Sequence, residues 1–254
     1  MALLRDGSAQ GGHQDHLEVL LLRRPAGSAF AASAEVFPGG SVDPADLEPS
    51  WQELLDGGAD QLAVDPGLAV AAIRETFEEC GVLRARERGG LPSSPRALAA
   101  LAPLRQGPGA AVPRALLEGM RRAGLRPAWE DLHFCAHWVT PEGLPRIFDT
   151  RFFLAGLPPG QDPSLVDQGE VDAMRWAEPG AALAEAEQGR TLLLPPTRSL
   201  LSQLKSQPSV AAALRAAAGW RVDRIQPRLE EITSQRYPGL DLDATSGTGP
   251  GGGG

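Results

Sequence analysis

The apolar and polar positions along the chain predict a mixture of buried strands and amphipathic helices. Short apolar runs bounded by turn-forming residues are typical of strands, whereas apolar residues that recur every three or four positions indicate helices. Strands are predicted at residues 17–24, 36–37, 132–140, 146–154 and 171–176. Helices are predicted at residues 50–55, 67–80, 94–104, 111–123, 181–188, 196–207 and 209–218. Because helices and hairpin-like strand pairs are interleaved, we expect an α/β sandwich built on a mixed sheet.

Changes in composition mark the ends of the predicted domain. Residues 1–16 are polar and glycine-rich, which favours a flexible N-terminal arm. Residues 237–254 end in a run of glycines and are expected to be disordered. Between these ends, residues 17–236 are predicted to form one domain. Two segments without a motif, at about 41–66 and 84–125, are interpreted as insertions that carry helices.

The charge of the chain excludes several classes of partner. Its 254 residues include 32 acidic and 24 basic side chains, giving a net charge of −8. We therefore expect no nucleic-acid or membrane-surface binding, since both need clustered positive charge. No apolar run approaches the ~18 residues of a membrane helix, and the N-terminus does not resemble a secretory signal. The 2 cysteines form no disulfide framework or zinc spacing, which favours a cytoplasmic protein. The sequence leaves the oligomeric state open.

The candidate chemistry is concentrated near the end of the helix at 67–80. Glu75, Glu78 and Glu79 fall on one helical face, and Arg74 is spaced to pair with Glu78 one turn later. One interpretation is a solvated acidic face, because like-charged neighbours on a helix cost only a few tenths of a kcal/mol per pair. The other is a site for Mg²⁺ or Mn²⁺, which prefer oxygen ligands on a rigid support.

The sequence around these carboxylates resembles the signature of the Nudix hydrolases. That signature is a glycine, a glutamate six residues later, and then Arg-Glu, an apolar residue, any residue, Glu-Glu, any residue, Gly and an aliphatic residue. Gly40 matches the first glycine and residues 74–82, Arg-Glu-Thr-Phe-Glu-Glu-Cys-Gly-Val, match the second half, with Thr76 at the usually apolar position. The resemblance implies a Nudix-type α/β/α sandwich.

The spacing inside this signature departs from the family pattern. The family places 13 residues between the glycine and the arginine, whereas positions 41–73 make 33 here, an insertion of 20. Pro66 stands where the first glutamate is expected when counted back from the arginine. Its role is therefore vacant or is taken by Asp43, Asp46 or Asp65. The branch of Nudix enzymes typified by the peroxisomal coenzyme A diphosphatase also carries an insertion inside the signature. The sequence therefore resembles that branch.

The resemblance implies roles for individual residues. Glu75, Glu78, Glu79 and the Gly40 carbonyl would hold Mg²⁺ or Mn²⁺ against the diphosphate of a small-molecule substrate. Glu75 would alternatively deprotonate the attacking water, and the sequence leaves both roles open. Arg74 would orient the carboxylates.

The substrate class implied by this branch is coenzyme A or acyl-CoA, cleaved to 3′,5′-ADP and (acyl-)phosphopantetheine. NADH, ADP-ribose or a nucleotide sugar is the alternative, because one scaffold serves many diphosphates. A hypothesis of a different class is a non-catalytic Nudix module that binds a nucleotide or a protein.

Five further residues are candidates for a role at the site. Arg23, Arg24 and Arg151 are possible partners for the adenosine 3′-phosphate of coenzyme A. Asp149 and Arg151 would either line the cleft or form a cross-strand ion pair. Glu170 precedes the strand predicted at 171–176, in the region where Nudix enzymes often place an additional acidic base or ligand.

Overall fold

One mixed sheet forms the centre of the molecule. The computed structural model describes residues 1–7, 16–28, 30–54, 64–87, 89–106, 112–144, 146–165 and 171–234. The strands of the main sheet are β1 (Ala2–Gly7), β2 (His16–Arg23), β3 (Ala34–Val36), β6 (His133–Val139), β7 (Asp149–Gly156), β8 (Ala173–Ala177), β9 (Leu192–Leu193) and β10 (Arg224–Ile225). Their order is β10-β6-β7-β1-β2-β3-β9, with β8 also paired to β2. Parallel pairs such as β1–β7 and antiparallel pairs such as β1–β2 occur together, so the predicted mixed sheet is confirmed.

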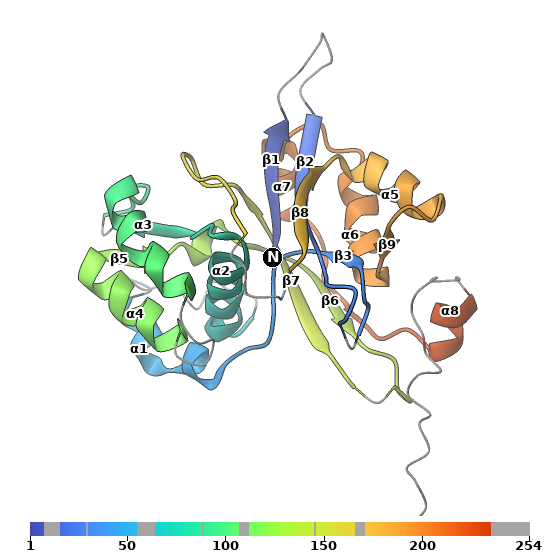
Figure 1. Cartoon of the computed structure of the whole chain (residues 1–254), viewed down its shortest axis with the longest axis horizontal. Coiled ribbons are helices and arrows are strands. Elements are labelled where there is room, and N and C mark those ends of the chain that lie inside the picture. The colour runs from blue at the N-terminus through green and yellow to red at the C-terminus, as the bar shows by residue number, and fades with distance from the viewer. Residues whose placement is uncertain are drawn as a thin grey trace, which may run out of the picture.

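Helices cover both faces of this sheet. The helices of the described residues are α1 (Pro49–Gln52), α2 (Pro66–Cys80), α3 (Pro95–Leu101), α4 (Val112–Ala123), α5 (Pro179–Glu187), α6 (Pro195–Leu204), α7 (Val210–Ala217) and α8 (Leu229–Ser234). The 3₁₀ helices are η1 (Pro44–Leu47), η3 (Ala102–Gln106) and η5 (Trp129–Asp131). Helices α2, α3 and α4 lie on one side of the sheet, with α5 and α6 on the other (Figure 1). The predicted α/β sandwich is thus confirmed.

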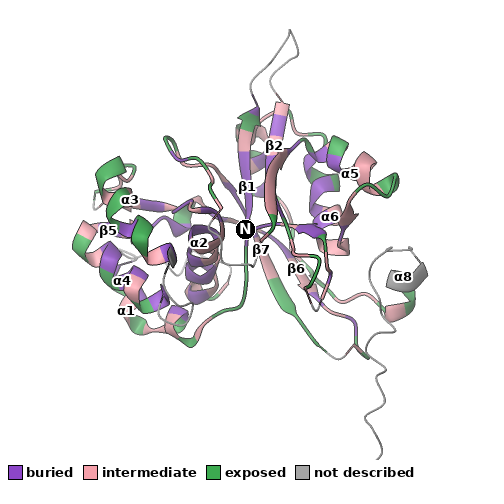
Figure 2. Cartoon of the chain, in the orientation of Figure 1, coloured by how far each residue is buried: buried purple, intermediate pink, exposed green. Residues whose placement is uncertain are grey.

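Alternation along β7 explains how the sheet joins two cores. Phe153 packs into the core that contains Ile73 and Phe77 of α2, whereas its neighbour Leu154 packs into the core that contains Leu200 of α6. Successive side chains of a strand point to opposite faces, so one strand serves both layers. Figure 2 shows the buried residues gathered on α2 and along the central strands.

The predicted N-terminal arm at 1–16 is wrong for its first seven residues. Ala2, Leu3 and Leu4 are completely buried, and β1 lies between β2 and β7 in the middle of the sheet. The apolar triplet is short and is followed by Arg5 and Asp6, so its burial depends on pairing with β7, a strand distant in the sequence. Residues 8–15 and the predicted disordered tail at 237–254 lie outside the described residues.

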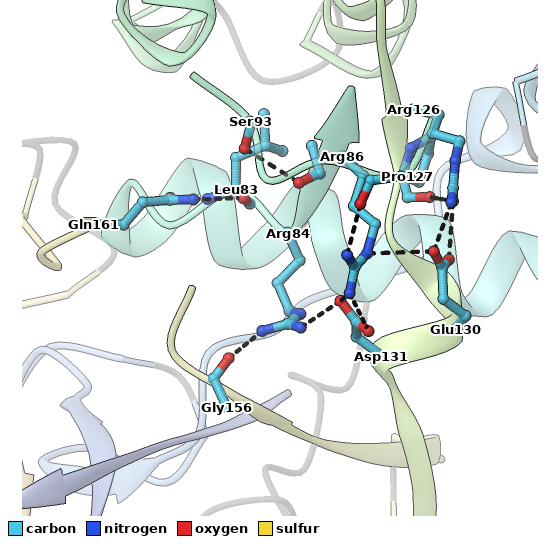
Figure 3. Close-up of polar contacts among 12 residues, drawn as sticks. Leu83, Arg84, Arg86, Ser93, Arg126, Pro127, Glu130, Asp131, Gly156 and Gln161 are labelled. Atoms are coloured by element: carbon cyan, nitrogen blue, oxygen red, sulfur yellow. Dashed lines mark hydrogen bonds and ion pairs between the residues drawn. The ribbon is translucent and has the colours of Figure 1, made fainter. Parts of the chain in front are cut away.

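The second insertion contains a small sheet that the sequence pattern did not predict. Strands β4 (Ala85–Glu87) and β5 (Leu125–Pro127) pair antiparallel and bracket α3 and α4. Asp131 of η5 accepts hydrogen bonds from Arg84 at 2.8 Å and from Arg86 at 2.8 and 2.9 Å (Figure 3). Arg84 also donates to the Gly156 carbonyl at the end of β7. Asp131 therefore joins the insertion to the main sheet.

Replacing Asp131 with Asn is expected to lower the free energy of unfolding by about 2 kcal/mol at neutral pH, because two arginines lose their common carboxylate. Burial raises the pKa of Asp131, but the hydrogen bond from Arg86 and the charge of Arg84 outweigh it, so this pKa lies below its ordinary value. Such a group stabilises the fold above the unfolded-state pKa of about 3.9, and this contribution is lost as the pH falls through the folded pKa.

Urea titrations at several pH values measure this effect. The difference in unfolding free energy between the wild type and Asp131→Asn should shrink below about pH 4. The exposed Asp172→Asn variant serves as the control and should unfold like the wild type at every pH. A difference for Asp131→Asn that stays constant down to pH 3 would contradict the prediction.

Candidate active site

The helix that carries the candidate chemistry begins and ends where local sequence signals place it. The Asp65 carboxylate accepts a hydrogen bond from the Gly67 backbone N–H at 2.8 Å, and Pro66 occupies the first turn. Gly81 ends the helix in the left-handed conformation, with φ of 75°. The helix predicted at 67–80 is confirmed as α2, and it presents its last turns to the Gly39-Gly40 turn.

Arg74 organises the site from a buried position. Its guanidinium binds both carboxylate oxygens of Asp46 at 2.8 Å and donates to the Ser41 carbonyl at 2.9 Å. Its Nη1 atom also donates to Glu75 at 2.9 Å and to Glu78 at 3.0 Å. The side chain of Arg74 is 4% exposed and that of Asp46 is 0% exposed. One guanidinium therefore fixes three carboxylates, and the predicted pairing of Arg74 with Glu78 is confirmed.

Of the three aspartates that were candidates for the role of the first signature glutamate, Asp46 is the one that contacts Arg74. Asp43 instead caps η1 by accepting from the Ala45 backbone N–H, and Asp65 caps α2. Asp46 stands six residues after Gly40, so it occupies the place of the first glutamate when counted from the glycine. The extra residues of the first insertion therefore follow Asp46, and the start of that segment belongs to the site.

The turn between β3 and η1 lies against the carboxylates of α2. Glu79 accepts a hydrogen bond from the Gly39 backbone N–H at 2.7 Å. A Cβ atom at Gly40 would lie 2.6 Å from the carboxylate of Glu75. Only glycine therefore lets the backbone approach Glu75 this closely.

Electrostatics of the site follow from its burial. Burial raises the pKa of Glu75, and the charge of Arg74 opposes this only in part. Burial disfavours the charged form of Arg74, but the hydrogen bond to Asp46 and the neighbouring carboxylates outweigh it and raise the pKa of Arg74 above its ordinary value. Arg74 is therefore permanently charged, as its contact with three acids requires.

The donor set fits a hard divalent cation in its chemistry. Glu75 and Glu78 offer carboxylate oxygens beside Arg74, and Glu79 offers them at the Gly39 N–H. The two oxygens of Asp46 are both bonded to Arg74, so Asp46 supports the site rather than adding to the donor set. The carboxylates of Glu75 and Glu78 are held on the same Arg74 atom. Among the described residues, however, no three His, Cys, Asp or Glu side chains converge closely enough to form a ready-made metal cage. A cation would therefore need water or substrate oxygens as further ligands, as Mg²⁺ usually does.

The candidate substrate residues lie in different surroundings. Arg23 is exposed at the end of β2, where it is paired in register with Glu35 of β3. Arg24 donates to the Phe30 carbonyl at 3.2 Å. Arg151 forms an ion pair with Asp149 at 2.6 Å, but both residues lie on β7, so this is not the cross-strand pair that was expected. The cross-strand contact of Asp149 is with His137 of β6 at 2.6 Å.

The remaining candidate, Glu170, lies outside the described residues. Sequence reasoning missed Arg105 and Ser164, which contact the end of α2. No local pattern would have found them, because both lie far from the helix in the sequence.

An α/β sandwich that presents Arg74 and three helical glutamates to a Gly-Gly turn defines a Nudix-type domain. The family model of the NUDT19 Nudix domain matches residues 58–204, more than half of the chain, so the chain belongs to that Nudix family.

Curated relatives and a solved structure agree with this family. The chain is 31% identical to the acyl-coenzyme A diphosphatase NUDT19 of Gallus gallus, in a match that covers 70% of this chain and 58% of that protein. It is also 31% identical to the Homo sapiens protein of the same name, over 70% of this chain and 57% of that protein. The chain thus spans little more than half the length of these relatives.

Among solved structures, the chain is similar to a NUDIX hydrolase from Alicyclobacillus acidocaldarius. The TM-score is 0.66 at 29% sequence identity, and the match covers 84% of this chain and 92% of that one. In the described part of the chain, no helix is long and apolar enough to cross a membrane.

Proposed function

We propose that this protein is a Mg²⁺- or Mn²⁺-dependent diphosphatase that cleaves coenzyme A or acyl-CoA to 3′,5′-ADP and (acyl-)phosphopantetheine. The observation that carries this proposal is the Arg74 network, which orients Glu75 and Glu78 beside the Gly39-Gly40 turn. The names of the chicken and human relatives support the substrate class.

The residues of α2 have distinct roles in this proposal. Glu75, Glu78, Glu79 and the Gly40 carbonyl would hold the cation. When bound, the cation would lower the pKa of a coordinated water and offset charge on the diphosphate. Arg74 keeps the carboxylates in place through its bonds to Asp46, so that they need not reorganise during the reaction.

The reaction is the addition of water to one phosphorus of the diphosphate, with cleavage of the P–O–P bond. The proton of the water must pass to a base. Glu75 is a candidate, since its carboxylate is held by Arg74 directly beside the Gly40 backbone. If Glu75 acts only as a ligand of the cation, another residue must accept the proton, and Glu170 is then the candidate.

Recognition of coenzyme A over other nucleotides would depend on its adenosine 3′-phosphate. Arg23 ends β2, the strand that neighbours β3, and Arg24 follows it; β3 leads into Gly39 and Gly40. Arg23 is the better candidate of the two, because it is exposed whereas Arg24 already donates to a backbone carbonyl. Arg151 would first have to leave Asp149.

A side-by-side assay of coenzyme A, dephospho-coenzyme A, NADH and ADP-ribose with Mg²⁺ or Mn²⁺ tests this function. We expect kcat/KM for coenzyme A to exceed that for dephospho-coenzyme A by about tenfold or more, the value of one charge-assisted contact to the 3′-phosphate. A higher kcat/KM for NADH or ADP-ribose than for coenzyme A would show that the proposed substrate class is wrong. Binding without release of any nucleotide would favour the non-catalytic module instead.

A further inference from the structure

The C-terminal end of α2 is closed by two segments that lie far away in the sequence. The last carbonyl groups of a helix have no partner inside the helix. Here the Glu78 carbonyl accepts a hydrogen bond from Arg105 Nε at 3.3 Å. The Cys80 carbonyl accepts one from the Ser164 backbone N–H at 2.8 Å. Two of the terminal carbonyls are therefore satisfied from outside the helix.

Arg105 connects three parts of the protein from a buried position. It belongs to η3 in the second insertion and is 8% exposed. Besides Glu78, it binds Ser164, with Nη1 donating to the hydroxyl at 3.0 Å and Nη2 to the carbonyl at 2.6 Å. A buried guanidinium is unfavourable unless it is hydrogen-bonded, so these contacts specify its position. A cation at a helix C-terminus is also favoured by the helix dipole.

Gly81 leaves the space that this guanidinium occupies. A Cβ atom at this position would lie 2.6 Å from Arg105 Nη1. The residue also has φ of 75°, which side chains rarely tolerate. Glycine therefore serves two purposes here: it ends the helix and it admits the arginine.

A second junction reinforces the same end of the helix. Gln161 is buried, and its side-chain amide bonds to both the N–H and the carbonyl of Leu83 at 2.9 Å. The segment after β7 is thus attached to the last residue of α2, Cys80, and to Leu83 just beyond the helix. Of these contacts, the one from Arg105 is made to Glu78, a residue that carries one of the carboxylates of the site.

Glu78 is held from two sides. Its carbonyl binds Arg105, while its carboxylate binds Arg74. Glu79, the next residue, places its carboxylate on the Gly39 N–H. The backbone that Arg105 fixes is therefore the backbone from which these two carboxylates extend.

We propose that Arg105 is a positioning residue, which holds the last turn of α2 so that Glu78 and Glu79 keep the geometry needed to bind a divalent cation. This inference rests on the proposed function. The second insertion then supports metal binding through one side chain.

Mn²⁺ binding measured by electron paramagnetic resonance of the free ion tests this role without relying on turnover. The Arg105→Met variant should raise the Kd for Mn²⁺ about tenfold, as expected for a residue that orients ligands. Arg105→Lys keeps the charge but cannot bridge Glu78 and Ser164 in the same way, so its Kd should be intermediate. At saturating Mn²⁺, the KM for substrate should stay within about twofold of the wild type for both variants.

The matched control is Arg86→Met, which removes an arginine of the same insertion that binds Asp131 and the Gly90 carbonyl rather than α2. Its Kd for Mn²⁺ should stay within about twofold of the wild type. Wild-type affinity in both Arg105 variants, or an equal loss in Arg86→Met, would overturn this inference alone. A wild-type protein that binds no Mn²⁺ would refute the proposed function as well. If Arg105→Met does not fold, the Kd of the Arg105→Lys variant for Mn²⁺ tests the inference.

Discussion

Replacing Glu79 with Gln is expected to lower kcat by about 100-fold or more at saturating Mg²⁺, because the side chain proposed to bind the cation loses its charge. The amide oxygen of Gln still accepts the hydrogen bond from the Gly39 N–H, which Glu79 accepts at 2.7 Å, so the fold should persist. Steady-state kinetics with coenzyme A, together with thermal unfolding, measure both consequences.

The control for this variant is Glu118→Gln. Glu118 lies on the exposed face of α4, and its side chain is 59% exposed. Its loss should leave kcat within about twofold of the wild type, as is usual for surface sites. If Glu79→Gln turned over at the wild-type rate, the assignment of Glu79 as a ligand would be wrong.

Replacing Asp46 with Ala is expected to produce the largest loss of stability. The change leaves the buried guanidinium of Arg74 without its bidentate partner, and breaking a buried ion pair costs about 3–5 kcal/mol. For a domain of this size, that corresponds to a fall in Tm of roughly 6–20 °C. Calorimetry or a fluorescence melt of the full chain measures it.

Two comparisons make this prediction specific. Asp46→Asn keeps the volume and one acceptor, so it should lose less stability than Asp46→Ala. Asp223, whose side chain is 69% exposed in its pair with Arg221, provides a surface control, and Asp223→Asn should change Tm very little. An equal Tm for Asp46→Ala and the wild type would mean that Arg74 does not depend on this partner.

Local signals were sufficient to predict the helix of the site. Asp65, Pro66 and Gly81 mark its ends, and the 3.6-residue period sets which side chains share a face. The spacing of Arg74 and Glu78 likewise predicted their ion pair, because residues four apart on a helix are neighbours. The mixed sandwich followed in the same way from the alternation of strands and helices.

Contacts between distant segments were beyond the reach of such patterns. Strand β1 is buried because it pairs with β7, and no pattern near residues 1–7 predicts that pairing. The choice of Asp46 over Asp43 and Asp65 depends on how η1 packs against α2, 28 residues further along the chain. Arg105 reaches Glu78 across 27 residues.

The sequence by itself therefore determined the helix of the candidate site, its carboxylates and the class of fold, since the elements depend on residues that are close together in the sequence. The tertiary structure alone decided which aspartate binds Arg74, where the N-terminal residues lie, and how the second insertion is attached to the helix. The physical reason is that buried charges are tolerated only where specific partners meet them, and those partners come together only when the chain has folded.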